Sequence, residues 1–138
     1  METSSKSAAK LQGNPGSVQG RLNQALEDAI AQTQCNAIAV ARRDGLVVVH
    51  RLPPGGDPRL VAAIAAATAG SSRKAAEELG QGTLEHLVIE CSQGTIIVTE
   101  TGPRAILVAL FAGRPDLAAV RGGLRESAER IEAILEEV

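Results

Sequence analysis

Aromatic side chains are almost absent from this sequence, whose 138 residues include no tryptophan, no tyrosine and one phenylalanine, Phe111. Proteins usually stack nucleic-acid bases, sugars and flavin rings on such side chains, so these ligands lack their usual platform here. The charges nearly balance, with 14 Lys and Arg against 16 Asp and Glu. A chain without a strong basic excess is a poor partner for nucleic acid or for a membrane surface. We therefore expect neither partner.

Cysteine is also scarce, since Cys35 and Cys91 are the only two. Two cysteines outside a CxxC pair form neither a disulfide scaffold nor a redox or zinc motif, which fits a reducing, cytoplasmic setting. We expect Cys91, which alternates with apolar residues, to be a buried and inert thiol. No apolar run approaches the roughly 20 residues of a membrane span, and the N-terminus has no signal-type apolar segment. A soluble cytoplasmic protein without membrane insertion is predicted.

Motifs for catalysis and metal binding are missing as well. A glycine-rich phosphate loop opens a helix, but Gly80-Gln81-Gly82 precedes a strand pattern. His50 and His86 stand in different strand patterns and have no companions at metal-ligand spacing. We therefore expect no catalytic residues, no metal, no cofactor and no enzyme. An enzyme would require a deep polar cavity around His50 or His86.

The sequence does contain a regular alternation of helix and strand patterns. Residues 1–17 are rich in Ser, Lys, Gln, Gly and Pro, and we expect a disordered tail there, before one domain over 18–138. Apolar residues at helical spacing predict helices over 17–33, 58–79 and 117–138, the first two capped by Ser17 and Asp57. Runs rich in β-branched residues predict strands over 37–43, 46–51, 84–91, 95–100 and 105–111. Asp44-Gly45 favours a type I′ hairpin turn between the first two strands.

The resulting order is αββαβββα. The last three strands are joined by connections too short for crossovers, so they form an antiparallel meander. Placing the hairpin beside the meander gives an α/β (α+β) domain with a five-stranded antiparallel sheet in the order 2-1-5-4-3. Strands such as 106–110 are apolar at both parities, so both faces of the sheet are covered. We expect the first and third helices on one face and the second helix on the other.

The predicted second helix has an unusual distribution of side chains. One side, which we expect to face the sheet, carries Leu60, Val61, Ile64, Thr68, Ala75 and Leu79. The opposite side carries Arg59, Ala63, Ala66, Gly70, Arg73 and Glu77. Small residues in the middle of a helix face allow a second helix to approach closely, which predicts contact with a second copy of the chain. A high alanine content alone would give the same pattern.

The strand predicted over 84–91 is the second candidate contact surface. It is long and proline-free, and the predicted order places it at an edge of the sheet. Such an edge can pair with another chain, and pairing about a two-fold axis would also align the neighbouring helices over 58–79. The candidate interface residues on this strand are Leu84, His86, Val88 and Glu90.

Several segments resemble the roadblock/dynein light chain family, over roughly residues 20–137. They are Leu22 to Ile30, the strand and Asp44-Gly45-Leu46 turn within Ala37 to Val47, the helix end at Ala75 to Gly80, and Leu87 to Glu90 with the meander. The resemblance is closest in type to prokaryotic single-domain, MglB-like members, and the composition rich in Arg and Ala also favours a prokaryote. It implies a roadblock/profilin-like layered fold and a noncatalytic homodimer that joins strands 84–91 edge to edge, with helices 58–79 side by side.

The same resemblance implies the partners. They are a second copy of the chain and a small Ras-like GTPase, which such a dimer binds as a regulator or scaffold, with or without stimulating GTP hydrolysis. Dynein light chains and endosomal scaffold subunits are the eukaryotic counterparts. The alternative is a monomeric profilin-like or longin-like adaptor that binds peptides or trafficking proteins, and a monomer in solution would favour it.

Overall fold

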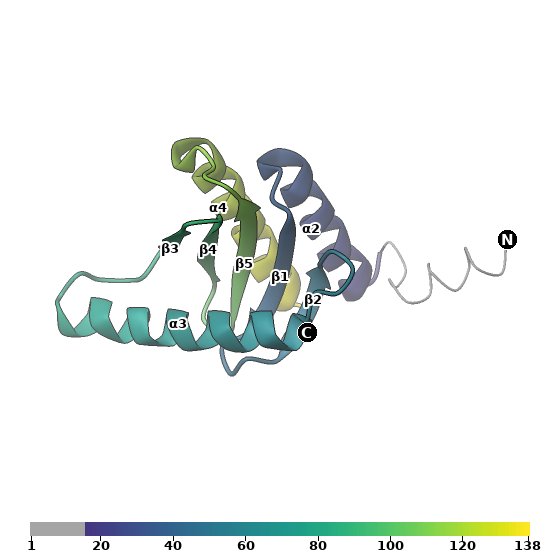
Figure 1. Cartoon of the computed structure of the whole chain (residues 1–138). Coiled ribbons are helices and arrows are strands. Elements are labelled where there is room, and N and C mark those ends of the chain that lie inside the picture. Colours follow the sequence, from purple (N-terminus) through teal and green to yellow (C-terminus); the bar gives the residue numbers. More distant parts are fainter. Residues whose placement is uncertain (1–15) are drawn as a thin grey trace, which may run out of the picture.

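The computed structural model describes residues 16–138 and places a five-stranded sheet between two layers of helix (Figure 1). The elements in chain order are α2 (Val18–Thr33), β1 (Ala37–Arg42), β2 (Val47–Arg51), α3 (Pro58–Glu78), β3 (His86–Cys91), β4 (Gly94–Thr101), β5 (Ala105–Ala112) and α4 (Leu117–Leu135). The strands are antiparallel in the order β2-β1-β5-β4-β3, which confirms the predicted architecture. Most of the predicted tail, residues 1–15, lies outside the described residues.

Side-chain caps determine where the helices begin. Ser17 Oγ accepts a hydrogen bond from the Gly20 amide at 3.0 Å. Asp57 caps α3 by accepting from two amides of its first turn, and Pro58 follows at the first helical position. Asp116 caps α4 in the same way. These bonds satisfy amides that have no partner inside the helix, and they confirm the predicted caps Ser17 and Asp57.

The turn between β1 and β2 differs from the predicted type I′. A type I′ turn needs a positive φ at both central residues, but here Gly45 and not Asp44 has one, at 94°. The Gly45 amide donates to the Arg42 carbonyl at 2.9 Å, and the Arg42 amide donates to the Leu46 carbonyl at 2.8 Å. The loop therefore has three residues, a turn followed by one left-handed glycine, and Asp44 keeps an ordinary backbone.

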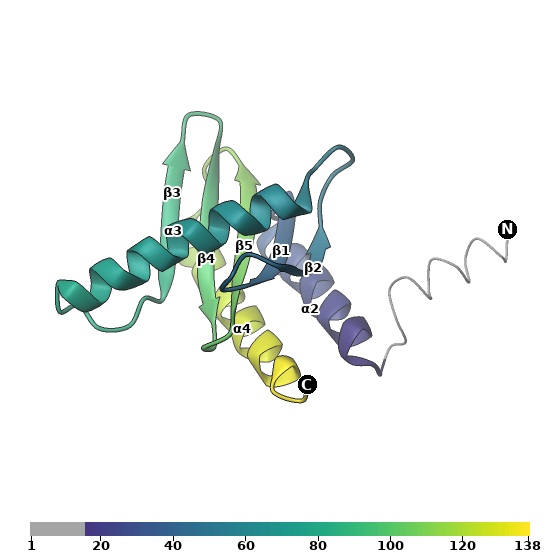
Figure 2. The same ribbon diagram turned by 90° about the horizontal axis from the view of Figure 1, so that it is seen from below.

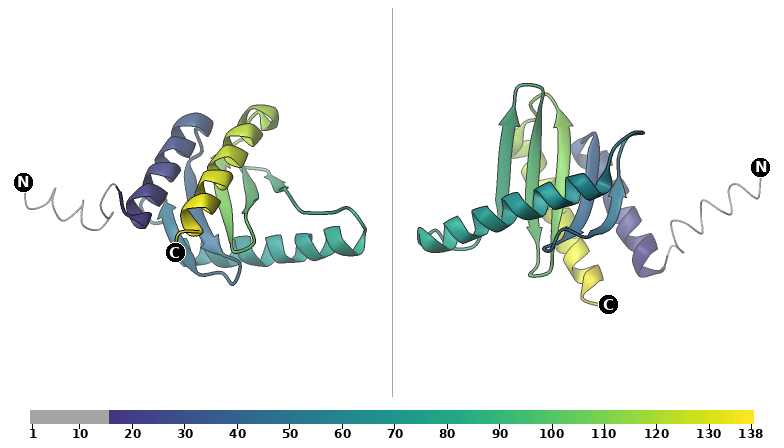
Figure 3. Two further views of the ribbon diagram at one scale, coloured as in Figure 1. Left: turned by 180° about the vertical axis from the view of Figure 1, so that it is seen from behind. Right: turned by 60° about the horizontal axis from the view of Figure 1, so that its bottom comes forward.

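The two faces of the sheet have different cores. α2 and α4 cover one face, as predicted (Figures 1 and 3). Large aliphatic side chains fill the space between these helices and the sheet. Fully buried examples are Leu22, Leu26, Ile38, Leu107, Leu124 and Ile131. α3 covers the other face, where the buried side chains are largely alanines: Ala39, Ala41, Ala62, Ala65 and Ala69.

The side of α3 that meets the sheet is not the predicted one. Leu60 and Ile64, expected to face inward, are 56% and 49% exposed. The inward side is turned by roughly 100° on the helical wheel, one residue step. The hydrophobic pattern selected the largest side chains, but α3 packs on alanines of β1, where only small side chains allow close approach. The buried side chains of α3 are Ala62, Ala65 and Ala69.

α3 also reaches beyond the sheet. It crosses the strands diagonally, and its C-terminal part runs past β3 (Figure 2). Its main contacts with the sheet are with β1, β5 and β2, and none of its residues after Ala69 is buried. Leu79, at the end of the helix, is 72% exposed. We call residues 70–79 the overhang of α3.

Candidate functional site

β3 is an open edge of the sheet. Among the strands of residues 16–138 it pairs with β4 alone, in regular register from His86 opposite Thr99 to Cys91 opposite Gly94. It has no proline and no bulge, and a regular edge of this kind presents backbone groups that can pair with another strand. Three of the residues predicted for an interface, His86, Val88 and Glu90, lie on β3, whereas Leu84 precedes it.

A groove of about 170 Å³ lies beside this edge, between α3 and the sheet. Its lining is almost entirely apolar and consists of Leu60, Val61, Ile64, Ala65, Thr68, Ile89, Ile96, Val108 and Leu110. Ile89 of β3 and Ile96 of β4 are directly opposite each other and line its floor. Apolar side chains gathered on an accessible surface mark a contact site more often than side chains exposed singly.

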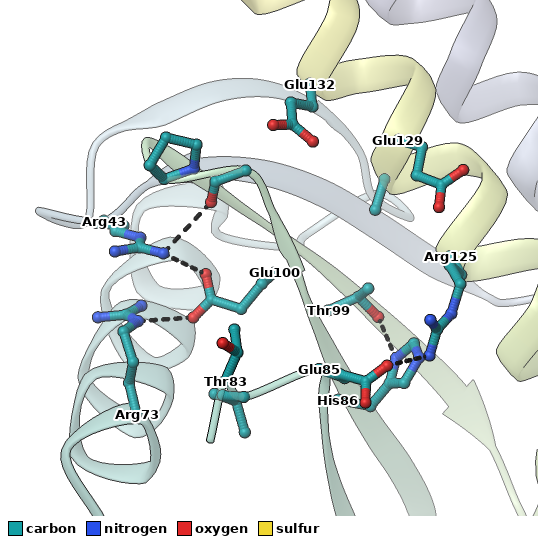
Figure 4. A pocket seen from close by; sticks show the side chains of 14 residues that line it. Arg43, Arg73, Thr83, Glu85, His86, Thr99, Glu100, Arg125, Glu129 and Glu132 are labelled. Carbon is teal, nitrogen blue, oxygen red and sulfur yellow. Dashed lines mark hydrogen bonds and ion pairs between the residues drawn. The ribbon is translucent and has the colours of Figure 1, made fainter. Parts of the chain in front are cut away.

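A second cavity, of about 400 Å³, lies at the opposite end of β4, between the overhang, the β4–β5 turn and α4 (Figure 4). Glu100 is central to it, with a side chain only 11% exposed. Arg73 Nε donates to Glu100 Oε1 at 2.7 Å, and Arg43 Nη2 donates to Glu100 Oε2 at 3.0 Å. Arg43 also donates to the Gly102 carbonyl at 3.3 Å. One carboxylate therefore joins α3, β4 and the segment after β1.

α4 supplies the opposite wall of this cavity. Glu129 and Glu132 of α4 line the cavity, and Arg125 forms an ion pair with Glu85 at 2.5 Å (Figure 4). Gly102 makes room for Glu132, because a Cβ on Gly102, whose φ is 71°, would lie 2.7 Å from Glu132 Cγ. Arginines of α3 and the β1–β2 turn thus face glutamates of α4, and neither sign dominates the lining.

His86 lies beside this cavity, but neither ring nitrogen is open to a ligand. Nδ1 is 3.0 Å from the hydroxyl of buried Thr99, and Nε2 is buried without a hydrogen-bond partner among the described residues. Burial, and then the charges of Arg125 and Arg121, lower the pKa of His86, while Glu85 opposes the shift. A neutral imidazole enclosed in this way is poorly placed to act as a general base.

The remaining candidate groups are dispersed. His50 is exposed on β2, at the far edge of the sheet. Cys35 is buried, and burial raises the pKa of its thiol. The expectation of a buried Cys91 is wrong, because Cys91 ends the edge strand β3 and is exposed. No three His, Cys, Asp or Glu side chains of residues 16–138 are grouped so that they could hold a metal ion.

The helices of the part of the chain that the structure describes are not membrane spans. None of them combines the length and the apolar character needed to cross a bilayer.

The six residues predicted as the outer face of α3 do not form one free surface. Ala63 and Ala66 lie near the β1–β2 turn, since a Cβ on Gly45 would be 3.6 Å from Ala63 Cα and 3.8 Å from Ala66 Cβ. Arg59 and Glu77 are exposed near the two ends of the helix. The turn therefore lies beside this face, where Ala66 is partly buried and Ala63 stays exposed.

The other two residues of that face have different surroundings. Arg73 is engaged by Glu100 within the same chain, whereas a Cβ on Gly70 would have no neighbour within 4 Å. Sequence reasoning missed Glu100 and its second partner Arg43. No local pattern links them, because Arg43 and Glu100 are 57 residues apart. The groove was missed because Leu60 and its neighbours were expected to face inward.

A sheet covered by one helix on one face and two on the other, with an open edge strand and an apolar groove beside it, defines a three-layer α/β domain. The sequence model of the Roadblock/LC7 domain matches residues 23–111, more than half of the chain. The chain belongs to the Roadblock/LC7 domain family, as the resemblance predicted.

Individual relatives agree with this assignment. The uncharacterized protein MJ1340 of Methanocaldococcus jannaschii is 37% identical over 95 residues, which cover 69% of this chain and 82% of the relative. Among solved structures, MglB with a tetrameric arrangement has a TM-score of 0.81 at 25% identity, covering 88% of this chain and 93% of that chain. The gliding protein MglB from Thermus thermophilus shares the fold, with a TM-score of 0.79 at 23% identity over 89% of this chain and 94% of that one. The predicted roadblock fold and the prokaryotic character of its relatives are confirmed.

Proposed function

We propose that this protein is a noncatalytic homodimer that binds a small Ras-like GTPase in the cytoplasm, as a regulator or scaffold. The observation that carries the homodimer is that one chain holds both an apolar groove and an unsupported helix end beside the same open strand. Membership of the Roadblock/LC7 family supports the GTPase, since the family resemblance implies that partner. A tetrameric arrangement in a similar MglB structure agrees with self-association.

A two-fold axis perpendicular to the sheet at the open edge of β3 makes the overhang of one copy complementary to the groove of the other. The overhang projects past β3 (Figure 2). The groove is lined by residues of the first half of α3 and of β3, β4 and β5, so it lies over the sheet and not beyond its edge. Rotation about this axis carries the overhang of each copy over the groove of the other. It also sets the two α3 helices antiparallel and brings the two β3 edges together as antiparallel strands.

The residues of α3 that face the second copy in this arrangement form a stripe that is apolar except at Thr68 and Ser71. Leu60, Ile64 and Thr68 line the groove, and Ala75 and Leu79 continue the same side of the helix along the overhang. Antiparallel packing about the middle of α3 places Leu79 of the second copy near Leu60, and Ala75 of the second copy near Ile64. Burial of Leu60, Ile64 and Leu79 then removes three of the large exposed apolar side chains from water.

The face containing Gly70, predicted from the sequence, is the competing contact surface of α3. It points away from the groove, and Arg73 on it is already paired within the chain. We therefore favour the apolar stripe for α3 and retain His86, Val88 and Glu90 as contact residues on β3, with Leu84 beside them. The two surfaces of α3 make different predictions for single substitutions.

Analytical ultracentrifugation over a range of concentrations tests the homodimer. The wild type is expected to sediment as a dimer, and Ile64→Asp is expected to be monomeric because it places a charge in the apolar contact. Gly70→Leu and Gly122→Leu are matched controls, since both glycines lie in helices with open space at the Cβ position. Both are expected to remain dimeric.

The opposite results are equally informative. Monomeric Gly70→Leu with dimeric Ile64→Asp would replace the apolar stripe by the Gly70 face. A wild type that is monomeric at every concentration would contradict the homodimer and favour a monomeric profilin-like or longin-like adaptor.

The GTPase needs a separate experiment. A Ras-like GTPase encoded beside this gene is loaded with GTP or with GDP and captured on the immobilised protein. Binding is expected to differ between the two nucleotide states, and the protein alone is expected to hydrolyse no GTP. Phosphate release by the GTPase, with and without the protein, separates an activator from a scaffold. Absence of binding in both states would contradict a role in GTPase regulation.

A further inference from the structure

The overhang of α3 has little packing to hold it in place. The last buried side chain of the helix is Ala69, and the nine positions 71–79 include no buried residue. Helices in proteins owe most of their stability to the packing of one face. A segment that lacks such packing frays easily unless another contact holds it.

One charged contact connects the overhang to the sheet. Within residues 16–138, the Arg73–Glu100 bond is the only side-chain hydrogen bond or ion pair that joins the overhang to a strand. The other charged pair of the overhang, Lys74 with Glu78, lies within the helix. Glu100 stands near the end of β4, and its side chain meets that of Arg73 at the cavity (Figure 4).

Arg43 fixes the carboxylate that holds Arg73. It binds the second oxygen of Glu100 and is itself anchored on the Gly102 carbonyl. Both oxygens of Glu100 are therefore occupied, which restricts its rotation and orients it toward α3. Loss of Glu100 would leave two arginines facing each other without a counter-charge.

The Arg73–Glu100 contact, which we call the tether, lies on the side of α3 away from the apolar stripe. Arg73 contacts Glu100 on that side, while Ala75 and Leu79 follow the same side of the helix as Leu60 and Ile64. We propose that Glu100 is a positioning residue, which fixes the overhang through Arg73 so that its stripe is presented to the groove of a second copy. This inference rests on the proposed homodimer, but its first step concerns a single chain.

Hydrogen exchange and sedimentation of Glu100→Gln test the two steps separately. Glu100→Gln keeps the shape of the side chain and removes its charge. Amide exchange of residues 71–79 is expected to rise at least about fivefold, while that of 61–69 in the same helix stays unchanged. The dimer dissociation constant is expected to rise on the order of tenfold. The matched control is Glu85→Gln, which breaks the exposed pair with Arg125 in the same cavity and is expected to change neither quantity.

Arg73→Gln provides an independent check and guards against a folding defect at Glu100. It is expected to reproduce both effects, and the double variant Arg73→Gln/Glu100→Gln is expected to add almost nothing to either single variant. Additive effects would overturn the proposal, because they would mean that the two residues act separately. If amide exchange in α2 and α4 also rises in Glu100→Gln, that variant is unfolding as a whole. Arg73→Gln alone then tests the proposal.

Two outcomes distinguish this proposal from the proposed function. Unchanged exchange at 71–79 in both single variants would overturn the tether, whatever the oligomeric state. Increased exchange at 71–79 in a protein whose wild type is monomeric would leave the tether standing and would overturn the homodimer and the role of Glu100 in it.

Discussion

The two faces of the sheet differ in how completely one chain covers them. On the α2/α4 face, two helices enclose large side chains such as Leu26, Leu107 and Ile131, each 0% exposed. On the α3 face, one helix packs closely on alanines and leaves Leu60 and Ile64 beside an open groove. The first face is a completely covered core, which we call the finished face. The second face combines a closely packed contact with an apolar groove that the chain leaves open.

The difference indicates which face supplies most of the stability and which face is the candidate for association. Burial of large aliphatic side chains supplies most of the free energy that holds a domain together. Alanines contribute less each, so α3 depends more on close fit and on the Arg73–Glu100 contact. A helix held in this way keeps its larger side chains available for a partner.

The largest effect is expected on the finished face. Leu107→Ala removes a fully buried side chain and is expected to lower the free energy of unfolding by about 3 kcal/mol. Ile64→Ala on the α3 face, measured at a concentration where the chain is monomeric, is expected to cost less than about 1 kcal/mol because Ile64 is half exposed. Urea unfolding checks both, and equal costs would remove the contrast between the faces.

Overpacking tests the close fit of α3. Ala62→Leu adds three carbons at a site with 0% exposure and is expected to lower the free energy of unfolding by about 2 kcal/mol. Ala67→Leu, at an exposed position of the same helix, is expected to stay within about 0.5 kcal/mol of the wild type. If Ala62→Leu leaves the free energy of unfolding unchanged in thermal or urea unfolding, α3 is not closely packed on β1.

A smaller, pH-dependent effect is expected where β3 meets α4. The folded chain lowers the pKa of His86, so the proton binds more readily to the unfolded chain. The stability associated with neutral His86 is complete above the ordinary histidine pKa of about 6.5 and is lost as the pH falls through the lowered folded value. Urea unfolding of His86→Gln should depend less on pH below about 6.5 than that of the wild type. An identical pH dependence in the two proteins would contradict this assignment.

The smallest effect is expected at an ion pair between helices that packing already holds together. Arg130 of α4 pairs with Asp28 of α2 at 2.5 Å, and this pair lowers the pKa of Asp28. Both side chains are more than 40% exposed, so Asp28→Asn is expected to cost less than about 1 kcal/mol. Its amide exchange in α2 is expected to match the wild type, unlike that of the overhang in Glu100→Gln. Fraying of α2 would show that surface charge also holds the finished face.

Much of the architecture follows from short-range features of the sequence. Ser17 and Asp57 mark helix starts because side-chain caps act within one turn, and short connections force the meander of β3, β4 and β5. The strand order, with β3 at an edge, follows from placing two such units side by side. The wrong turn type at Asp44-Gly45 arose because two-residue and three-residue loops use the same residues.

The site was harder to predict because the residues that meet there are far apart in the sequence. The inward side of α3 is chosen by the alanines Ala39 and Ala41 on β1, which helical periodicity alone does not detect. The Arg43–Glu100–Arg73 contact joins three segments, and charges at such distances give no sequence pattern. The spacing of Ala62, Ala65 and Ala69 was the available signal, since these small residues share one side of the helix.

The sheet has a second edge, β2, and its form limits polymerisation. β2 has five residues, its register with β1 shifts between Val40 and Ala41, and Pro53 and Pro54 follow it. Arg51 on it is also tied to Glu27 of α2 at 3.4 Å. A short, irregular and partly obstructed margin is a poor template for further strands. In the proposed homodimer each chain therefore pairs through β3 alone, which allows a closed pair of chains and opposes an open filament.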